Sequence, residues 1–371
     1  MKELVVWAYS YCRSTLAFYR GLGRAFGVPL KVCVWKEIAK FRTKVGFTEN
    51  EFSDMDITFI GDDYDKARNI LNERREAHHI FGAYQSVKIF QILMIEAKNM
   101  GCRIGIASEA PCNMTPTGYK RILKNIYIRY FLPYIIKNQI AASDFIINFS
   151  GDDFDPLEKI GWPKTKIIPC GYYSPRIENT RLVKRDEQSW KNFSILLSGI
   201  HQWHRSPMLL LKALNVLKQK GLSPKCDITQ EGPLLNEMKK YVKHNHLDNV
   251  KFHGFVEMKT LINLYETCSV YVGTGNYEPW GMRLNDVLQC GAPLVVNRGM
   301  GGAKMVEDYG CGMIFGRNDY NALATILENL ILKKDLYCKV AEAAYNACQF
   351  IKPEVKAAEI VKIIRNNYKG W

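Results

Sequence analysis

The chain has 371 residues, 47% of them hydrophobic, and this combination predicts two well-packed domains of about 150–200 residues rather than a single core. Its formal net charge of +14 favours an anionic partner, and a membrane surface or a phosphorylated ligand is a stronger candidate than nucleic acid, because no nucleic-acid-binding motif occurs. The sequence has no run of about 18 apolar residues and no signal-peptide pattern, which argues against a transmembrane helix and against secretion. It also has no Cys-x-x-Cys pair, which argues against a disulfide framework and a zinc site. These features favour a cytoplasmic protein.

The first 175 residues alternate strand-like and helix-like segments. Short apolar runs typical of buried strands lie at 4–7, 30–35, 56–60, 78–81, 102–107 and 144–149, and segments with helical apolar spacing lie at 15–26, 62–74 and 86–100. Asp62 is placed to cap one of these helices, and Asp152 and Asp153 are placed to cap a further helix that reaches Ile160. The alternation predicts a Rossmann-like domain, with a parallel sheet between two layers of helices.

Residues 119–136 predict a basic amphipathic helix. Apolar and aromatic side chains recur there at a spacing of three or four, at Tyr119, Ile122, Leu123, Ile126, Tyr127, Tyr130, Phe131 and Tyr134. Five cations accompany them, Lys120, Arg121, Lys124, Arg129 and Lys137, and no acid occurs between Ala110 and Ser143. Such a helix can lie on an anionic bilayer, so we predict membrane-surface contact through 119–137. The alternative is that the stripe packs into the first domain while the cations are solvated, and both can hold in part.

A second alternation begins after the polar run 176–191, which is the best linker candidate by composition. Strand-like runs lie at 193–197, 226–229, 250–256, 269–272 and 292–296, and helical segments at 282–289, 320–331, 336–350 and 353–368. Within this half, the run at 269–272 leads into a loop rich in glycine and proline, followed by a helix and another strand. The N-terminus of that helix would suit a phosphate.

Two carboxylates mark this stretch, Glu278 in the loop and Asp286 eight residues later, about two helical turns on. Taken alone, the pair also fits an ordinary βαβ crossover with two surface acids. Residues 278–296 read E-P-W-G-M-R-L-N-D-V-L-Q-C-G-A-P-L-V-V. They resemble E-G-F-G-x-x-x-x-E-A-M-A-C-G-x-P-V-V, the signature of the retaining glycosyltransferases of family 4 type, among the glycosyl transferases of group 1. Asp286 stands where that family has its second Glu.

The resemblance covers most of 193–350 and is only architectural in 1–173. It implies the GT-B fold, an α/β architecture of two Rossmann-like domains facing each other across a cleft, with a C-terminal helix that returns to the first domain. Residues 1–175 and 351–371 would form the acceptor domain, and residues 176–350 the nucleotide-sugar donor domain.

Donor-site roles follow from the same resemblance. The family shows G-R-L-x-x-x-K-G in the first loop of the second domain, where this chain has Gly199 and, at the Lys position, Arg205. Ile200 stands at the Arg position, and Arg283 is a plausible replacement for the missing cation. His201 and His204 either contact phosphate or sugar, or are ordinary loop residues.

The other donor-binding candidates fall on the two strand ends and on the signature. The backbone at Phe255 and Val256 would receive the nucleobase, and Asp286 would bind the ribose hydroxyls. Glu278 would hold hydroxyls of the donor sugar, or act as a catalytic residue that stabilises an oxocarbenium-like transition state. The residues that remain would surround the diphosphate, namely Gly281, Met282, Arg283 and Leu284.

The acceptor candidates are Arg13 and Glu109. The family usually has a Gly-Gly pair after the first strand, whereas this chain has Arg13 in that loop, as a substitute contact or as a solvated arginine. Glu109 lies where the family often has a polar residue near the acceptor hydroxyl, and we weigh a catalytic or acceptor-site role against that of a surface loop residue.

The sequence therefore predicts a retaining hexosyl- or N-acetylhexosaminyltransferase that uses a nucleotide sugar and a saccharide acceptor. Because of the basic helix, we expect a lipid-linked acceptor and a protein that lies at the inner face of the cytoplasmic membrane. The reaction would then belong to the synthesis of a cell-surface polysaccharide or glycoconjugate. No cofactor or metal is expected, because no D-x-D-like motif follows a strand. The alternatives are an inverting GT-B transferase or epimerase, a non-catalytic nucleotide- or sugar-binding protein, and a nicotinamide-dependent dehydrogenase, which the missing G-x-G-x-x-G disfavours.

Overall fold

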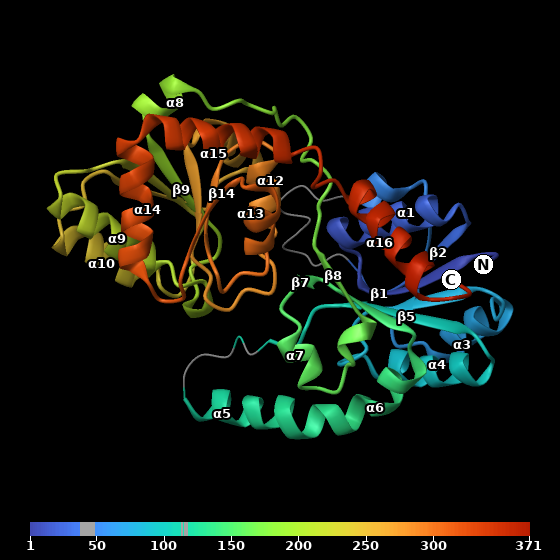
Figure 1. Cartoon of the computed structure of the whole chain (residues 1–371). Coiled ribbons are helices and arrows are strands. Elements are labelled where there is room, and N and C mark those ends of the chain that lie inside the picture. Colours follow the sequence, from blue (N-terminus) through green and yellow to red (C-terminus); the bar gives the residue numbers. More distant parts are fainter. Residues whose placement is uncertain (38–48, 113, 115–117) are drawn as a thin grey trace. The chain divides into compact units, whose positions relative to one another are not determined.

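The structure is a computed structural model that describes residues 1–37, 49–112, 114 and 118–371, and it divides the chain into two units, each built on its own sheet (Figure 1). Of the described residues, the first unit contains 1–37, 49–112, 118–175 and Lys352–Trp371, and the second contains Met114 and Arg176–Ile351. The predicted α/β class is confirmed, because strands alternate with helices throughout both units.

The sheet of the first unit has the strand order β3-β2-β1-β4-β5-β6-β8-β7, and every neighbouring pair is parallel except β7 and β8. Its central strands read as continuous apolar runs because helices cover both faces. The strands are β1 (Leu4–Ser10), β2 (Leu30–Lys36), β3 (Asp56–Phe59), β4 (His78–Phe81), β5 (Arg103–Ser108), β6 (Phe145–Asn148), β7 (Ser150–Gly151) and β8 (Ile167–Gly171).

The helices α3, α4 and α6 cover one face of this sheet, and α1 and α16 cover the other (Figure 1). Their bounds, with the short helical turns, are α1 (Arg13–Phe26), η1 (Glu49–Phe52), α3 (Tyr64–Glu73), α4 (Lys88–Asn99), α5 (Tyr119–Ile126), η2 (Tyr127–Phe131), α6 (Leu132–Ala142), α7 (Asp155–Glu158), η3 (Lys164–Lys166) and α16 (Pro353–Asn367).

Two predicted helix caps are wrong. The cap of α3 is Asp63, whose carboxylate accepts the amide of Lys66 at 2.9 Å, while Asp62 accepts a hydrogen bond from Trp35 Nε1 instead. Asp62 and Asp63 are adjacent and have the same side chain, so the sequence alone could not show which of them caps the helix. The helix that follows Asp152 and Asp153 is the single turn α7, and its N-cap residue is Phe154 rather than either aspartate.

The C-terminal helix α16 packs on α1 within the first unit, as the resemblance implied. Gly21 of α1 allows this close approach, since a Cβ at that position would lie 2.7 Å from Cβ of Ala357. Arg365 of α16 donates to the carbonyl of Phe26 at 3.1 Å, and Trp371 packs edge-on against Phe145. The last 20 residues are therefore part of the first unit's core.

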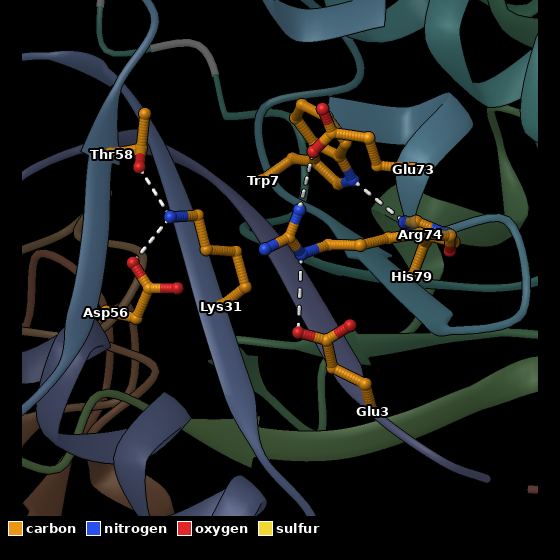
Figure 2. A network of polar contacts seen from close by, with 8 residues as sticks. All are labelled: Glu3, Trp7, Lys31, Asp56, Thr58, Glu73, Arg74 and His79. Atoms are coloured by element: carbon orange, nitrogen blue, oxygen red, sulfur yellow. Dashed lines mark hydrogen bonds and ion pairs between the residues drawn. The ribbon is translucent and has the colours of Figure 1, made fainter. Parts of the chain in front are cut away.

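Figure 2 shows a polar network at the end of this sheet where the strands begin. Lys31 donates to Asp56 and Thr58, and Arg74 bridges Glu3 and Glu73 (Figure 2). Beside them, Trp7 Nε1 donates to Nδ1 of the fully buried His79, whose Nε2 faces the carbonyl of Arg74 at 3.2 Å. Ligands of open α/β sheets bind at the opposite, carboxyl edge, so this network is structural.

The second unit has a parallel sheet of order β11-β10-β9-β12-β13-β14, with α9, α10 and α14 on one face and α12 and α13 on the other (Figure 1). Its elements are α8 (Glu187–Lys191), β9 (Ser194–Ser198), η4 (Trp203–Arg205), α9 (Met208–Gln219), β10 (Lys225–Thr229), α10 (Leu235–His244), β11 (Val250–Gly254), α11 (Met258–Thr267), β12 (Val270–Gly273), α12 (Arg283–Leu288), β13 (Leu294–Asn297), α13 (Ala303–Tyr309), β14 (Gly312–Phe315), α14 (Tyr320–Leu332) and α15 (Lys334–Ala347).

The polar run 176–191, predicted as a linker, is built into the second unit. Arg185 is 3% exposed and donates to the carbonyls of Cys268, Val183, Cys290 and Tyr265 at 2.6–3.0 Å. Five N–H donors on one planar group make arginine suited to this task. Polar composition is therefore misleading here, because the charged side chain satisfies buried backbone rather than water.

Candidate functional site

The candidate site of the second unit lies where its strand order reverses. The chain leaves β9 toward β10 on one side and leaves β12 toward β13 on the other, so the loops after β9 and β12 diverge from neighbouring strands. Such a switch point at the carboxyl edge is the usual ligand position of an open α/β sheet. The loops concerned are residues 199–206 and 274–282, which carry most of the donor-site candidates.

Main-chain hydrogen bonds join these two loops. The carbonyl of His204 accepts the amides of Asn276 and Tyr277 at 2.9 and 3.3 Å, and the Thr274 hydroxyl donates to the carbonyl of Arg205 at 2.6 Å. The loops consequently form one surface, and side chains from both are held at fixed separations.

Arg205 and Glu278 form an ion pair across this junction. Arg205 Nε lies 3.1 Å from Oε2 of Glu278, and Nη2 lies 3.5 Å from Oε1. His204 Nε2 lies 3.8 Å from the same Oε2, but burial lowers the pKa of His204, and the adjacent Arg205 lowers it further while Glu278 opposes the shift. At neutral pH the imidazole is therefore uncharged, and Arg205 provides the counter-charge of Glu278.

A second arginine side chain, that of Arg283, also lies close to Gly199. A Cβ on Gly199 would lie 3.2 Å from Nη1 of Arg205 and 3.7 Å from Nε of Arg283, and the φ of +139° also favours glycine at this position. Arg283 begins α12 and donates to the buried Tyr265 hydroxyl at 2.9 Å. Burial works against its charge, yet Tyr265, Tyr271 and the nearby Asp286 more than offset that effect and keep the pKa of Arg283 raised. Two charged arginine side chains therefore lie close to Gly199, which has no side chain of its own.

Three asparagines that the sequence analysis did not single out hold the loop of Glu278. Asn276, on that loop, donates to Asn318 and accepts from Nδ2 of Asn297 at 2.8 Å and from the amide of Asn318 at 3.1 Å. The Asn297 side-chain oxygen also accepts the amide of Gly299 at 2.8 Å, and the Gly299 carbonyl accepts the amide of Glu278. Asn276 and Asn297 are buried. The cluster links the loops after β12, β13 and β14 to the backbone of Glu278.

The remaining donor candidates differ in how they are placed. Gly281 has φ of +93°, and a Cβ there would lie 2.4 Å from Cε of Met300, so a larger residue would displace the signature loop. Met282 is half-buried, whereas Leu284 is fully buried and its amide already donates to the carbonyl of Gly281. Phe255 is 59% exposed and Val256 half-buried, just after β11.

The candidates of the first unit lie at the carboxyl edge of its own sheet. Arg13 is not a solvated loop residue, because Nε contacts both carboxylate oxygens of Glu51 at 2.7 Å and Nη1 donates to the carbonyl of Pro175 at 3.2 Å. Glu109 follows β5 and is half-buried. The pKa of the Tyr172 phenol is raised, first by burial of the ring and second by the negative charge of the nearby Glu109.

Residues 183–347, which contain the donor-site candidates, match the family model described as Glycosyl transferases group 1. The second unit is a group 1 glycosyltransferase domain. Mannosylfructose-phosphate synthase of Agrobacterium fabrum is 27% identical over 143 residues, which amount to 35% of this chain and 32% of that protein. The match therefore spans about a third of this relative's length.

Solved structures extend the likeness to the whole chain at the level of fold. Anabaena HepE in complex with UDP has a TM-score of 0.69 at 14% identity and covers 99% of this chain and 100% of its own. The lipopolysaccharide outer core galactosyltransferase WaaB has a TM-score of 0.70 at 10% identity and covers 98% of this chain and 99% of its own. The group 1 glycosyltransferase domain is thus part of a GT-B fold, as predicted.

Across 1–37, 49–112, 114 and 118–371, no group of three His, Cys, Asp or Glu side chains is arranged to hold a metal ion. No helix in these ranges has both the length and the apolar character needed to cross a bilayer.

Proposed function

We propose that the protein is a retaining glycosyltransferase that moves a hexosyl or N-acetylhexosaminyl group from a nucleotide sugar to a saccharide acceptor. The observation that carries the proposal is the pair of arginine side chains close to Gly199, at the switch point of a group 1 glycosyltransferase domain. A diphosphate needs two such cations and a backbone that approaches closely, and arginine is well suited to phosphate oxygens.

Each candidate residue has a task in this reaction. Arg205 and Arg283 would stabilise the diphosphate as the bond to the anomeric carbon breaks and negative charge builds on the leaving oxygen. Asp286 would accept hydrogen bonds from the ribose hydroxyls, and Phe255 with Val256 would line the place of the nucleobase. Glu278 would hold the sugar close to the departing oxygen and oppose the positive charge that develops on its ring. No metal is needed where two arginines neutralise the diphosphate.

Arg13 and Glu109 would serve the acceptor. Glu109 is the candidate to orient or deprotonate the attacking hydroxyl. Arg13 would either contact the acceptor itself or hold Glu51, so that the segment of Glu51 contacts the acceptor. We propose a lipid-linked saccharide as the acceptor, in cell-surface polysaccharide or glycoconjugate synthesis, and a peripheral location at the inner face of the cytoplasmic membrane. The exposed basic segment 119–137 supports this part of the proposal, and so does the lipopolysaccharide substrate in the name of the structural neighbour WaaB.

The test is a panel of UDP-, GDP- and ADP-activated sugars offered to the purified protein with and without saccharide acceptors. We expect one donor class to raise the melting temperature, acceptor-dependent release of the nucleoside diphosphate, and activity that persists in a chelator. NMR of the product should give the anomeric configuration of the donor. An inverted product would point to an inverting GT-B enzyme, binding without turnover to a sugar-binding protein, and stabilisation by nicotinamide cofactors alone to a dehydrogenase.

A further inference from the structure

An exposed apolar face runs along the helical segment that begins the second half of the first unit. Nine large apolar side chains of α5, η2 and α6 are between 41% and 72% exposed, namely Tyr119, Ile122, Leu123, Ile126, Tyr127, Tyr130, Phe131, Tyr134 and Ile135. None of the residues of α5 or η2 is buried, although all of them are described. Water-soluble surfaces rarely carry so many contiguous large apolar groups without a partner.

The π-helical turn η2 aligns the two halves of this face. In an uninterrupted α-helix, at about 100° per residue, Ile135 would lie about 160° around the axis from Tyr119, on nearly the opposite side. The additional residue in the π turn takes up about 100° of that rotation and leaves about 60°. The apolar residues after the turn therefore continue the face that the residues before it begin.

The same rotation directs the other side of α6 into the core. Leu132, Ile136 and Ile140, which recur every four residues along α6, are at most 8% exposed and belong to the hydrophobic core that α4 also lines. One side of α6 thus anchors the segment while its opposite side joins the outward face. Figure 1 shows α5 and α6 continuing each other along the edge of the first unit.

The positive charges around the apolar face favour an anionic partner. Lys120, Lys124, Arg129 and Lys137 make no ion pair within the part of the chain that the structure describes, and no acid occurs between residues 110 and 143. Arg129 and Lys137 lie over the rings of Tyr130 and Tyr134, at 5.5 and 4.4 Å from the ring centres. Tyrosines at such a border suit the boundary between headgroups and acyl chains, and the long cationic side chains can reach anionic headgroups beside them.

We propose that α5, η2 and the exposed side of α6 form a single in-plane docking face for an anionic bilayer, and that the π turn is the element that makes the face continuous. The inference rests on the proposed function only for its biological sense, since a lipid-linked acceptor would be reached from such a position. Binding itself needs neither donor nor acceptor.

The experiment measures binding of the full chain to vesicles of phosphatidylcholine alone and of phosphatidylcholine with phosphatidylglycerol, in the absence of any sugar. We expect binding to the anionic vesicles only. The pair Leu123→Ser and Tyr134→Ser should lower the affinity about tenfold or more, because both side chains leave water on docking. The exposed Leu332→Ser, at the same 59% exposure as Leu123 but in the second unit, is the matched control and should leave binding unchanged.

The charge and the register are tested separately. Lys120→Gln with Lys137→Gln should lower affinity for anionic vesicles by on the order of tenfold and make it less sensitive to salt. Insertion of two alanines after Asn125 keeps every apolar and charged residue but rotates residues 119–125 by about 200° against the rest, and should weaken binding about tenfold. The in-register control is Asn125→Ala, which should bind as the parent does.

Two results would overturn the proposal. Equal binding by the parent and the variant with two alanines inserted after Asn125 would show that no continuous face is needed. A parent that ignores vesicles but forms a dimer in sedimentation, and loses it with Leu123→Ser and Tyr134→Ser, would assign the face to a second copy of the chain. Either result would leave sugar transfer, measured with a soluble acceptor, untouched, so failure of the docking face is distinguishable from failure of the proposed function.

Discussion

Arg205 and Glu278 lie 73 residues apart in the sequence, yet Nε of the one is 3.1 Å from Oε2 of the other. The pair spans the two loops that diverge at the strand-order switch, and only 15% of the Glu278 side chain is exposed. A diphosphate bound at Gly199 would compete with Glu278 for Arg205. We expect donor binding to turn the carboxylate toward the sugar, so that arrival of the leaving group and positioning of the Glu278 carboxylate are coupled.

The first prediction concerns the two arginines. Arg205→Ala should lower kcat by about 10²–10³, since a donor aimed at charge that develops in the transition state has this effect elsewhere. Arg283→Ala should give a smaller version of the same loss if Arg283 compensates for Ile200. Steady-state kinetics with the identified donor measure both, and Arg298→Ala, a 65% exposed arginine paired with Glu307, is the control. A severe Arg205→Ala beside a silent Arg283→Ala would leave a single-cation site and disprove the compensation.

The second prediction concerns Asp286. If its carboxylate accepts the ribose hydroxyls, Asp286→Ala should weaken donor binding about 10- to 150-fold, which corresponds to a charge-assisted hydrogen-bond contribution of about 1.5–3 kcal/mol. Asp286→Glu should be tolerated, because the resembled family has Glu there. Calorimetric titration with the nucleoside diphosphate measures the effect, and Asp308→Ala, on the neighbouring helix α13, serves as control. An Asp286→Ala variant with parental affinity would remove this residue from the site.

The sequence predicted elements whose signal is local. Strands β1, β2 and β6 were found because both of their faces are covered and they read as largely apolar runs. The edge strand β14 went unrecognised, since it is four residues long, begins with glycine and lies among half-buried side chains. The order of the strands, and hence the switch point between β9 and β12, is a tertiary property that spacing along the chain does not contain.

The candidate site divides in the same way. Arg205, Glu278 and Arg283 could be named from a motif. The ion pair between Arg205 and Glu278, and the approach of both arginines to Gly199, could be seen only in the structure. Asn276 and Asn297 gave no signal, because asparagine after a strand usually marks a solvated turn. Their burial reverses that interpretation, since a buried amide must find partners and therefore fixes the loops that supply them.

The third prediction concerns the buried Arg185. Arg185→Met keeps much of the side-chain volume but removes the guanidinium that donates to four carbonyls. The carbonyls of Cys290 and Tyr265 keep a second donor, the amide of Val183 and Sγ of Cys268, whereas those of Cys268 and Val183 lose the donor that Arg185 supplies, and a carbonyl left unpaired in the interior costs about 1–3 kcal/mol. We expect the free energy of unfolding of the second unit to fall by about 3 kcal/mol or more, measured by urea denaturation. The adjacent Lys184→Met, 60% exposed, is the matched control. Equal losses in the two variants would show that the run 176–191 behaves as the solvated linker its composition suggests.

The fourth prediction is a pH dependence that originates in the first unit. Burial lowers the pKa of His79 to about 4, although the hydrogen bond to the Arg74 carbonyl opposes the shift. Trp7 donates to Nδ1, so the neutral imidazole carries its proton on Nε2, and a second proton would break the Trp7 bond. In the unfolded chain the same group has a pKa of about 6.5.

Between about pH 6.5 and pH 4 the unfolded chain therefore binds a proton at His79 that the folded chain does not, and stability falls as the pH falls through this window. The full loss from this residue is about 3 kcal/mol and is complete near pH 4, below which both states are protonated. His79→Gln retains an acceptor for Trp7 and a donor for Arg74 but does not titrate. We expect its free energy of unfolding, from urea titrations at pH 7.5 and pH 4.5, to decline less on acidification than that of the parent, while the exposed His244→Gln declines as the parent does. An acid dependence in His79→Gln as steep as the parent's would show that His79 is already protonated in the folded state and that the Trp7 hydrogen bond does not hold it neutral.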